Sequence, residues 1–131
     1  MTQHSFITLK KRSDFLRLAS GHKFVVASVI VQAARTPSAE GESHANQIRI
    51  GFTATRKLGN AVVRNRVKRR LREAARKMLP LHGAAGHDYV FIGRAATAQC
   101  SFEKLCQDMT FALTKILTYK PPARKKDEPA S

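Results

Sequence analysis

The segment from residue 56 to residue 73 carries the side chains whose chemistry is easiest to interpret. It holds eight cations against one acid, Glu73, and arginine outnumbers lysine among the cations. The planar guanidinium of arginine favours forked, two-bond contacts to phosphate and stacking on exposed bases. This composition indicates a polyphosphate partner, and it favours structured RNA over bulk DNA.

A helix is expected to position most of these cations. Asn60 is a favoured helix N-cap, and apolar residues then recur at helical spacing until Pro80 ends the pattern. These apolar residues are Val63, Val67, Leu71, Ala74 and Met78. They predict an amphipathic helix of about five turns with one buried stripe. Cations occupy both flanks of that stripe.

Like charges follow one another along this helix. On one flank, cations stand at successive i, i+4 positions: Arg64, Lys68, Arg72 and Arg76. Each such pair costs a few tenths of a kcal/mol in an isolated helix, and Glu73 is the one acid among them. We therefore expect a ligand to supply the missing negative charge. The helix start, preceded by Arg56 and Lys57, also offers free N–H groups and a positive dipole end to phosphate.

The whole chain is strongly basic. Its 131 residues include 24 Lys and Arg against 9 Asp and Glu, a formal net charge of +15. A merely solvated surface usually mixes both signs, so we favour polyanion binding. No apolar run approaches the roughly 20 residues of a membrane span, and the N-terminal region lacks the apolar core of a signal peptide. We expect a cytoplasmic protein without a membrane partner.

No catalytic constellation is evident. Metal-dependent cleavage of phosphodiesters needs clustered carboxylates, and the acids of this chain show no such spacing. Outside the predicted loop and tail, the acids are Asp14, Glu73, Asp88, Glu103 and Asp108. A Ser-His-Asp or Cys-His arrangement is not recognisable, and Cys100 and Cys106 fit neither a disulfide scaffold nor a zinc knuckle. We expect no catalytic residue in the protein itself.

Hydropathy and turn signals predict a single α+β domain in the order helix-strand-strand-helix-strand-helix. The predicted elements are a helix at 13–20, strands at 24–34 and 47–55, a helix from 60 to about 78, a strand at 88–94 and a helix at 102–119. Ser13 is the expected N-cap of the first helix and Gly21 its terminator. A mobile connection at 36–46 joins two antiparallel strands, and a βαβ crossover follows the second strand. The proline-rich charged tail, residues 120–131, is expected to be disordered.

The basic segment resembles the signature of the bacterial ribonuclease P protein subunit. The likeness rests on residues 57–72, KLGNAVVRNRVKRRLR, with the core Arg64-Asn65-Arg66, and it extends over about residues 9–119. It implies an RNA-binding domain at 1–119 that binds the catalytic RNA of ribonuclease P and assists removal of the 5′ leader from precursor tRNA. The protein would be the non-catalytic subunit of a ribonucleoprotein endoribonuclease. Magnesium ions held mainly by the RNA would perform the hydrolysis, and no DNA partner is expected.

The resemblance also implies a fold. Family members have a single-domain sandwich around a central sheet, similar to the second domain of ribosomal protein S5. Their parallel strands are joined by a left-handed βαβ crossover, whereas such connections are right-handed in general. The handedness follows from the resemblance alone.

Two sets of contact residues are implied by position in the family. The set facing the catalytic RNA is Arg56, Lys57, Asn60, Arg64, Asn65, Arg66, Lys68, Arg69 and Arg72. The set lining a cleft for the single-stranded leader is Phe15, Ala19, Ser28, Ile30, Gln32 and Arg94. Some relatives carry aromatic residues at or near the positions of Ala19 and Gln32, so base stacking is expected to be reduced here, with Phe15 as the main platform. The competing interpretation is that Phe15 and Ile30 only pack the core.

Two other functions fit parts of this sequence. A ribosomal or general RNA-binding protein would have the same charge, and it would bind unrelated RNAs equally without stimulating precursor processing. A stand-alone metal-dependent nuclease would cleave without an RNA subunit, and the scarcity of carboxylates argues against it.

Overall fold

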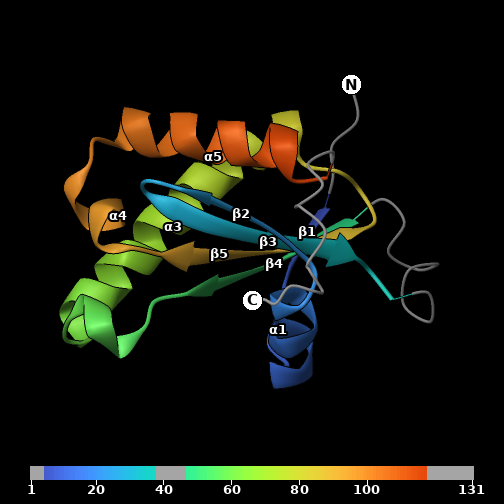
Figure 1. Ribbon diagram of the computed structural model, residues 1–131, viewed down its shortest axis with the longest axis horizontal. Helices are drawn as coiled ribbons and strands as arrows, with labels where there is room; N and C mark the ends of the chain where they lie inside the picture. Colours follow the sequence, from blue (N-terminus) through green and yellow to red (C-terminus); the bar gives the residue numbers. More distant parts are fainter. Residues whose placement is uncertain (1–4, 38–46, 118–131) are drawn as a thin grey trace, which may run out of the picture.

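The computed structural model of the chain describes residues 5–37 and 47–117. These residues form one five-stranded sheet with helices on both faces, so the predicted α+β class is confirmed (Figure 1). In chain order the elements are β1 (Ser5–Thr8), α1 (Arg12–Ala19), β2 (His22–Val26), β3 (Val29–Arg35), β4 (Gln47–Thr53), the 3₁₀ helix η1 (Arg56–Leu58), α3 (Ala61–His82), β5 (His87–Gly93), α4 (Ala95–Gln99) and α5 (Phe102–Ile116).

The strands lie in the order β1-β4-β5-β3-β2. β4 and β5 are parallel neighbours joined through α3, which confirms the predicted βαβ connection. β3 runs antiparallel to β5. The strands on either side of the 36–46 connection, β3 and β4, are therefore opposite in direction as expected, but β5 lies between them. Residues 38–46 of that connection lie outside the described ranges.

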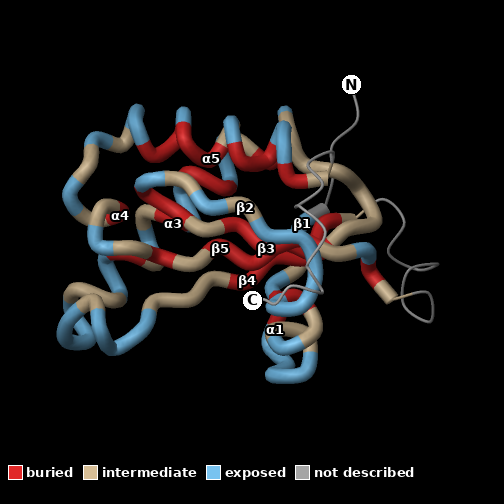
Figure 2. Tube along the Cα trace, in the orientation of Figure 1, coloured by how far each residue is buried: buried red, intermediate tan, exposed pale blue. Residues whose placement is uncertain are grey.

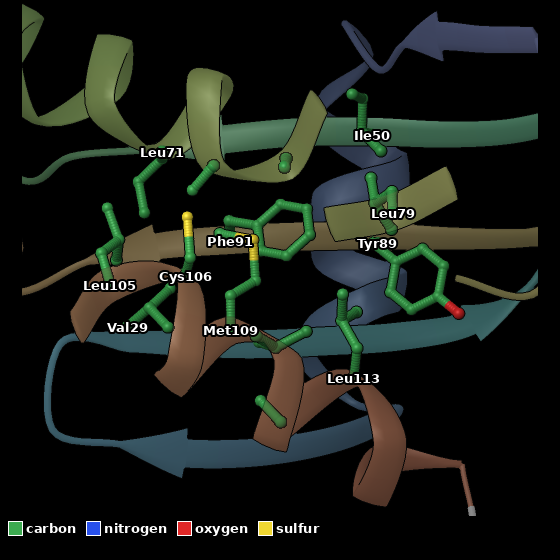
Figure 3. Close-up of a cluster of buried hydrophobic side chains, with 14 of the residues drawn as sticks. Val29, Ile50, Leu71, Leu79, Tyr89, Phe91, Leu105, Cys106, Met109 and Leu113 are labelled. Atoms are coloured by element: carbon green, nitrogen blue, oxygen red, sulfur yellow. The ribbon is translucent and has the colours of Figure 1, made fainter. Parts of the chain in front are cut away.

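Alternation along the strands divides the apolar residues between two layers. Val29, Ile50 and Phe91 point to the face covered by α3 and α5, where the main core lies (Figure 3). Their neighbours on the opposite face meet α1, where Leu9, Leu18 and Val90 form a smaller cluster. The side of α5 that faces the sheet is buried, and the opposite side is exposed (Figure 2). The sheet is thus sandwiched between α1 on one side and α3 with α5 on the other.

The predicted long strand at 24–34 is wrong. It is a hairpin, β2 and β3, with its turn at Ala27 and Ser28. Neither Gly, Pro, Asn nor Asp marks this turn, so the apolar run reads as continuous. The Ser28 hydroxyl instead donates to the Asp108 carboxylate of α5 at 2.7 Å, a contact that no local pattern reveals. The strand β1 and the short helix α4 were also not predicted.

Several predicted helix ends differ from the observed ones. α1 begins at Arg12 with Lys11 at the N-cap position, so Ser13 is not the cap, and Ser20 rather than Gly21 follows its last residue. α3 continues past Pro80, which lies in its last turn, and ends before Gly83. A proline there removes one N–H from the helix, while the Gly83 N–H still donates to the Leu79 carbonyl oxygen at 2.8 Å. The last helix ends at Ile116, and the predicted disordered tail lies outside the described residues.

Candidate nucleic-acid interface

The start of α3 is built by two residues. Gly59 has φ 141°, a conformation that side chains disfavour, and turns the chain from η1 into the helix. Asn60 then accepts the Val63 N–H on its side-chain oxygen at 3.0 Å, which confirms the predicted N-cap. The helix therefore begins at a defined residue, with Arg56 and Lys57 exposed on η1 just before it.

The apolar stripe of α3 is buried as predicted. Val67, Leu71 and Ala74 are buried, Val63 and Met78 are half-buried, and the stripe is widened by buried Ala75 and Leu79. With this stripe against the sheet and α5, the cations turn outward. Those implied to face RNA are exposed or half-buried: Arg56, Lys57, Arg64, Arg66, Lys68, Arg69 and Arg72, together with the exposed amides Asn60 and Asn65.

The cations of η1 and α3 lack carboxylate partners within the described residues. Three of the five acids there are engaged elsewhere: Asp14 and Asp88 pair with arginines of α1 and β4, and Asp108 pairs with Lys104. The other two, Glu73 and Glu103, form no ion pair among the described residues. Arg70 differs from its neighbours, because its Nη2 donates to the Cys100 carbonyl oxygen at the junction with α5. The remaining cations form a surface of uncompensated positive charge, as the sequence predicted.

The other face of the sheet carries a buried ion-pair network. Arg49 of β4 donates from Nε and Nη2 to the two carboxylate oxygens of Asp88, at 2.9 and 2.7 Å. Thr36 donates to Asp88 at 2.8 Å, and Arg17 of α1 binds both Asp88 and Asp14. Burial alone would raise the pKa of Asp88, but the hydrogen bonds from Arg49, Thr36 and Arg17 outweigh it and hold the pKa below its ordinary value. The network ties α1 to three segments of the sheet layer.

Next to α1, one cross-strand row of side chains is left partly open. The register aligns Val25 with Ile30, Ile30 with Ile92, and Ile92 with Thr53. The row therefore crosses β2, β3, β5 and β4 on the face of the sheet against which α1 packs. Val25 is 50% exposed, and the other members are half-buried. It is a largely apolar floor beside α1, and Ile92 packs against the cluster that α1 forms with the sheet.

The leader-contact residues implied by resemblance are only partly brought together here. Phe15 is half-buried, and its ring packs directly on the backbone of Gly51. A Cβ added at Gly51 would lie only 2.7 Å from the ring atom Cζ of Phe15. Ile30 belongs to the open row, while Gln32 lies one row further toward α1 and is only 8% exposed. Ala19 is exposed at the end of α1.

Ser28 and Arg94, the other two residues implied to contact the leader, lie at the ends of the β2–β3 hairpin turn and of β5. Ser28 is 1% exposed and turned toward α5, where its N–H and hydroxyl both donate to Asp108, so it lies apart from the other residues implied to contact the leader. Arg94 follows β5, and its Nη1 donates to the Val26 carbonyl oxygen at 2.8 Å. The guanidinium keeps further donors free for a ligand at the edge of the row.

A metal centre is not evident in the described part of the chain, where no three His, Cys, Asp or Glu side chains gather. Likewise, none of the described helices has the length and apolar character needed to cross a membrane.

Comparison with known proteins decides the family. The profile of the family described as ribonuclease P matches residues 4–117. The chain belongs to the ribonuclease P protein family. The ribonuclease P protein component of Ruegeria pomeroyi is 49% identical over 114 residues, covering 86% of this chain and 88% of that protein. The component of Paramagnetospirillum magneticum is 45% identical over 109 residues, covering 82% and 80%.

Solved structures of ribonuclease P proteins share this fold. The protein from Staphylococcus aureus superposes with a TM-score of 0.63 at 26% identity, covering 85% of this chain and 92% of that one. The protein from Thermotoga maritima gives a TM-score of 0.67 at 23% identity, covering 87% and 98%. The likeness of fold therefore covers most of this chain.

Sequence reasoning missed three members of the open row in this ribonuclease P protein. Val25, Ile92 and Thr53 come from three different strands, and their alignment depends on a strand order that local patterns do not specify. The alternation of β4 was the available signal, because it placed Thr53 opposite the core residues Ile50 and Phe52.

Proposed function

We propose that this ribonuclease P protein binds the catalytic RNA of ribonuclease P through the cations of η1 and α3, and that the two together remove the 5′ leader of precursor tRNA. The observation that carries this proposal is the set of α3 cations without a carboxylate partner among the described residues. Such a surface is stabilised when phosphates supply the counter-charge. Family membership identifies the class of RNA.

The proposed RNA-docking surface consists of the residues that the resemblance implied: Arg56, Lys57, Asn60, Arg64, Asn65, Arg66, Lys68, Arg69 and Arg72. Two features support it besides charge. The capped start of α3 presents free N–H groups beside Arg56 and Lys57, an arrangement suited to phosphate. The helix is also held rigidly, because its stripe is buried against the sheet and α5, so the guanidinium groups are positioned before binding.

The leader of the precursor is proposed to lie across the open row beside α1. Phe15 borders this floor from α1, and Ile30 lies within it. Ala19, Gln32 and Arg94 surround it and complete the assignment. An apolar floor with an aromatic edge suits single-stranded nucleotides, whose bases are unstacked and free to contact it.

The protein is proposed to contribute binding rather than bond cleavage. Asp88 and Asp14 are saturated by Arg17 and Arg49, so these carboxylates are not free to hold a metal ion. Magnesium bound mainly by the RNA subunit would activate water and stabilise the developing charge on the phosphate. The cytoplasm, where precursor tRNA would be met, is the proposed compartment.

Reconstitution at low magnesium tests the function. The full chain is added to a cognate ribonuclease P RNA, and cleavage of a precursor tRNA is followed. We expect strong stimulation with cleavage at the mature 5′ end, and no cleavage by the protein alone. Equal affinity for unrelated RNAs without stimulation would replace the proposal by the general RNA-binding alternative.

A further inference from the structure

A small pocket lies on the opposite side of α3 from α5, between that helix and the sheet edge. Its volume is about 200 Å³. Phe6 and Thr8 of β1 and Phe52 of β4 line it from the sheet, and Arg72 and Arg76 line it from α3. The register pairs Phe6 with Ile48 and Thr8 with Ile50, which places both β1 side chains on the α3 face.

The pocket combines aromatic walls with a cationic rim. Phe52 is stacked on Phe91 with ring centroids 5.7 Å apart, so its position is fixed by the core. The Arg72 guanidinium lies 5.6 Å from the centroid of the same ring. Within the described residues, neither Arg72 nor Arg76 is paired with a carboxylate. A partly aromatic slot beside two guanidinium groups without a carboxylate partner is suited to a ligand with a flat ring and a negative charge.

The two arginines also connect this pocket to the RNA-docking surface. They continue the i, i+4 row that begins with Arg64 and Lys68, and successive members of such a row are about 6 Å apart along the helix. An RNA strand whose phosphates contact this row of cations would reach the mouth of the pocket. The charge is thus continuous from the capped start of α3 to Arg76.

We propose that the pocket receives one unpaired base of the RNA subunit, with the adjoining phosphate bound by Arg76. This inference rests on the proposed function. Pockets for drug-sized ligands measure roughly 300–1,000 Å³, so the smaller volume here suits one base rather than a longer segment. Phe6, which is 36% exposed on the edge strand β1, supplies a face for stacking, and the Thr8 hydroxyl can donate to or accept from the base edge.

Variants of the pocket test the proposal through affinity for the RNA subunit. Phe6→Leu keeps apolar bulk but removes the aromatic face, and Arg76→Ala removes the phosphate contact. Phe6→Leu is expected to weaken binding by roughly 5- to 150-fold, which corresponds to the loss of one base-stacking contact. Arg76→Ala is also expected to weaken binding, because it removes a charged contact to phosphate. Lys77→Ala is the matched control, because Lys77 is the next residue on α3, is exposed, and lies on the α5 side. It should change affinity far less.

Crosslinking then identifies the base. A photoreactive benzophenone side chain placed at Phe6 is expected to crosslink one nucleotide of the RNA subunit. Removing that base should weaken binding of the wild-type protein by the same factor as Phe6→Leu, and should not weaken the Phe6→Leu protein further. Strictly additive losses, or no crosslink to RNA, would overturn the proposal. So would a loss confined to Arg76→Ala, since that outcome describes a phosphate contact without a base pocket.

Different results would contradict the proposed function and the pocket inference. If the wild-type protein neither binds the RNA nor stimulates cleavage, the proposed function is wrong. If it does both while the Phe6 and Arg76 variants behave like wild type, only the pocket inference falls.

Discussion

Arg49 and Asp88 are directly opposed on the neighbouring parallel strands β4 and β5, and they form a two-bond ion pair with N···O distances of 2.9 and 2.7 Å. The Asp88 side chain is fully buried, and Arg17 reaches it from α1. This pair lies beneath the helix that borders the proposed leader site. It therefore links the stability of the sheet to the placement of Phe15.

Replacing Asp88 by Asn should strongly destabilise the fold. The substitution leaves the buried guanidinium of Arg49 without its counter-charge, and breaking one partner of a buried pair costs roughly 3 to 5 kcal/mol. Urea unfolding followed by circular dichroism measures the change. Glu73→Gln serves as the control, because Glu73 is exposed on α3 and has no ion pair among the described residues. A loss below about 1 kcal/mol for Asp88→Asn would contradict this account.

Acid should destabilise the protein through the same carboxylate. The pKa of Asp88 in the folded protein is lowered from its ordinary value of 3.8. Its contribution to stability is therefore complete above the unfolded pKa and is lost as pH falls through the lower, folded value. We expect the unfolding free energy to fall below about pH 4, and to fall less steeply in Asp88→Asn. Identical pH profiles for the two proteins would exclude Asp88 as a source of the acid sensitivity.

Ser28→Ala should lower the stability of the fold and leave affinity for the leader unchanged. Burial would raise the pKa of Asp108, but hydrogen bonds from Ser28 and Lys104 lower it overall, so Asp108 accepts as a carboxylate. Loss of a buried hydrogen bond to a charged group costs about 1.5 to 3 kcal/mol. Thermal unfolding should show this loss, while affinity for a leader-bearing precursor stays unchanged at temperatures where the variant is folded. A selective loss of leader affinity would restore Ser28 to the binding site.

Ile30→Ala should separate leader binding from binding of the RNA subunit. The substitution removes apolar contact surface from the open row beside α1. We expect the binding free energy of the precursor to weaken by about 1 kcal/mol, which is roughly fivefold in affinity. The measurement compares precursor tRNA with and without a leader on the reconstituted ribonucleoprotein. Leu16→Ala is a suitable control, since Leu16 is exposed on α1. Equal losses for both RNAs would contradict a leader contact.

Local signals in the sequence predicted the basic helix well. The Asn60 cap and the stripe around Leu71 depend on residues within a few turns of each other, and both are observed. The network around Asp88 could not be predicted in this way, because Arg49 lies 39 residues away and approaches only through the strand order. The hairpin was missed since its turn lacks the usual turn residues. Strand alternation extended through that turn would place Ser28 on the same face as Ile30, whereas its hydroxyl contacts Asp108 of α5.

The cations of α3 are proposed to bind the phosphates of the RNA subunit. The test compares wild type with a variant in which Arg64, Arg66 and Lys68 are replaced by Ala, a residue that favours helix. A second variant removes the same charge from Lys10, Lys11 and Arg12, which lie exposed at the start of α1, on the other face of the sheet. This control separates loss of local contacts from loss of net charge.

The most direct measurement is the salt dependence of affinity for the ribonuclease P RNA in these three proteins. Each lost phosphate contact lowers the slope of log affinity against log salt by roughly 0.7 to 0.9. We predict that the α3 variant binds more weakly with a slope reduced by about 2 to 3, while the α1 variant keeps a slope close to wild type. An unchanged slope in the α3 variant would remove these residues from the interface and contradict the account.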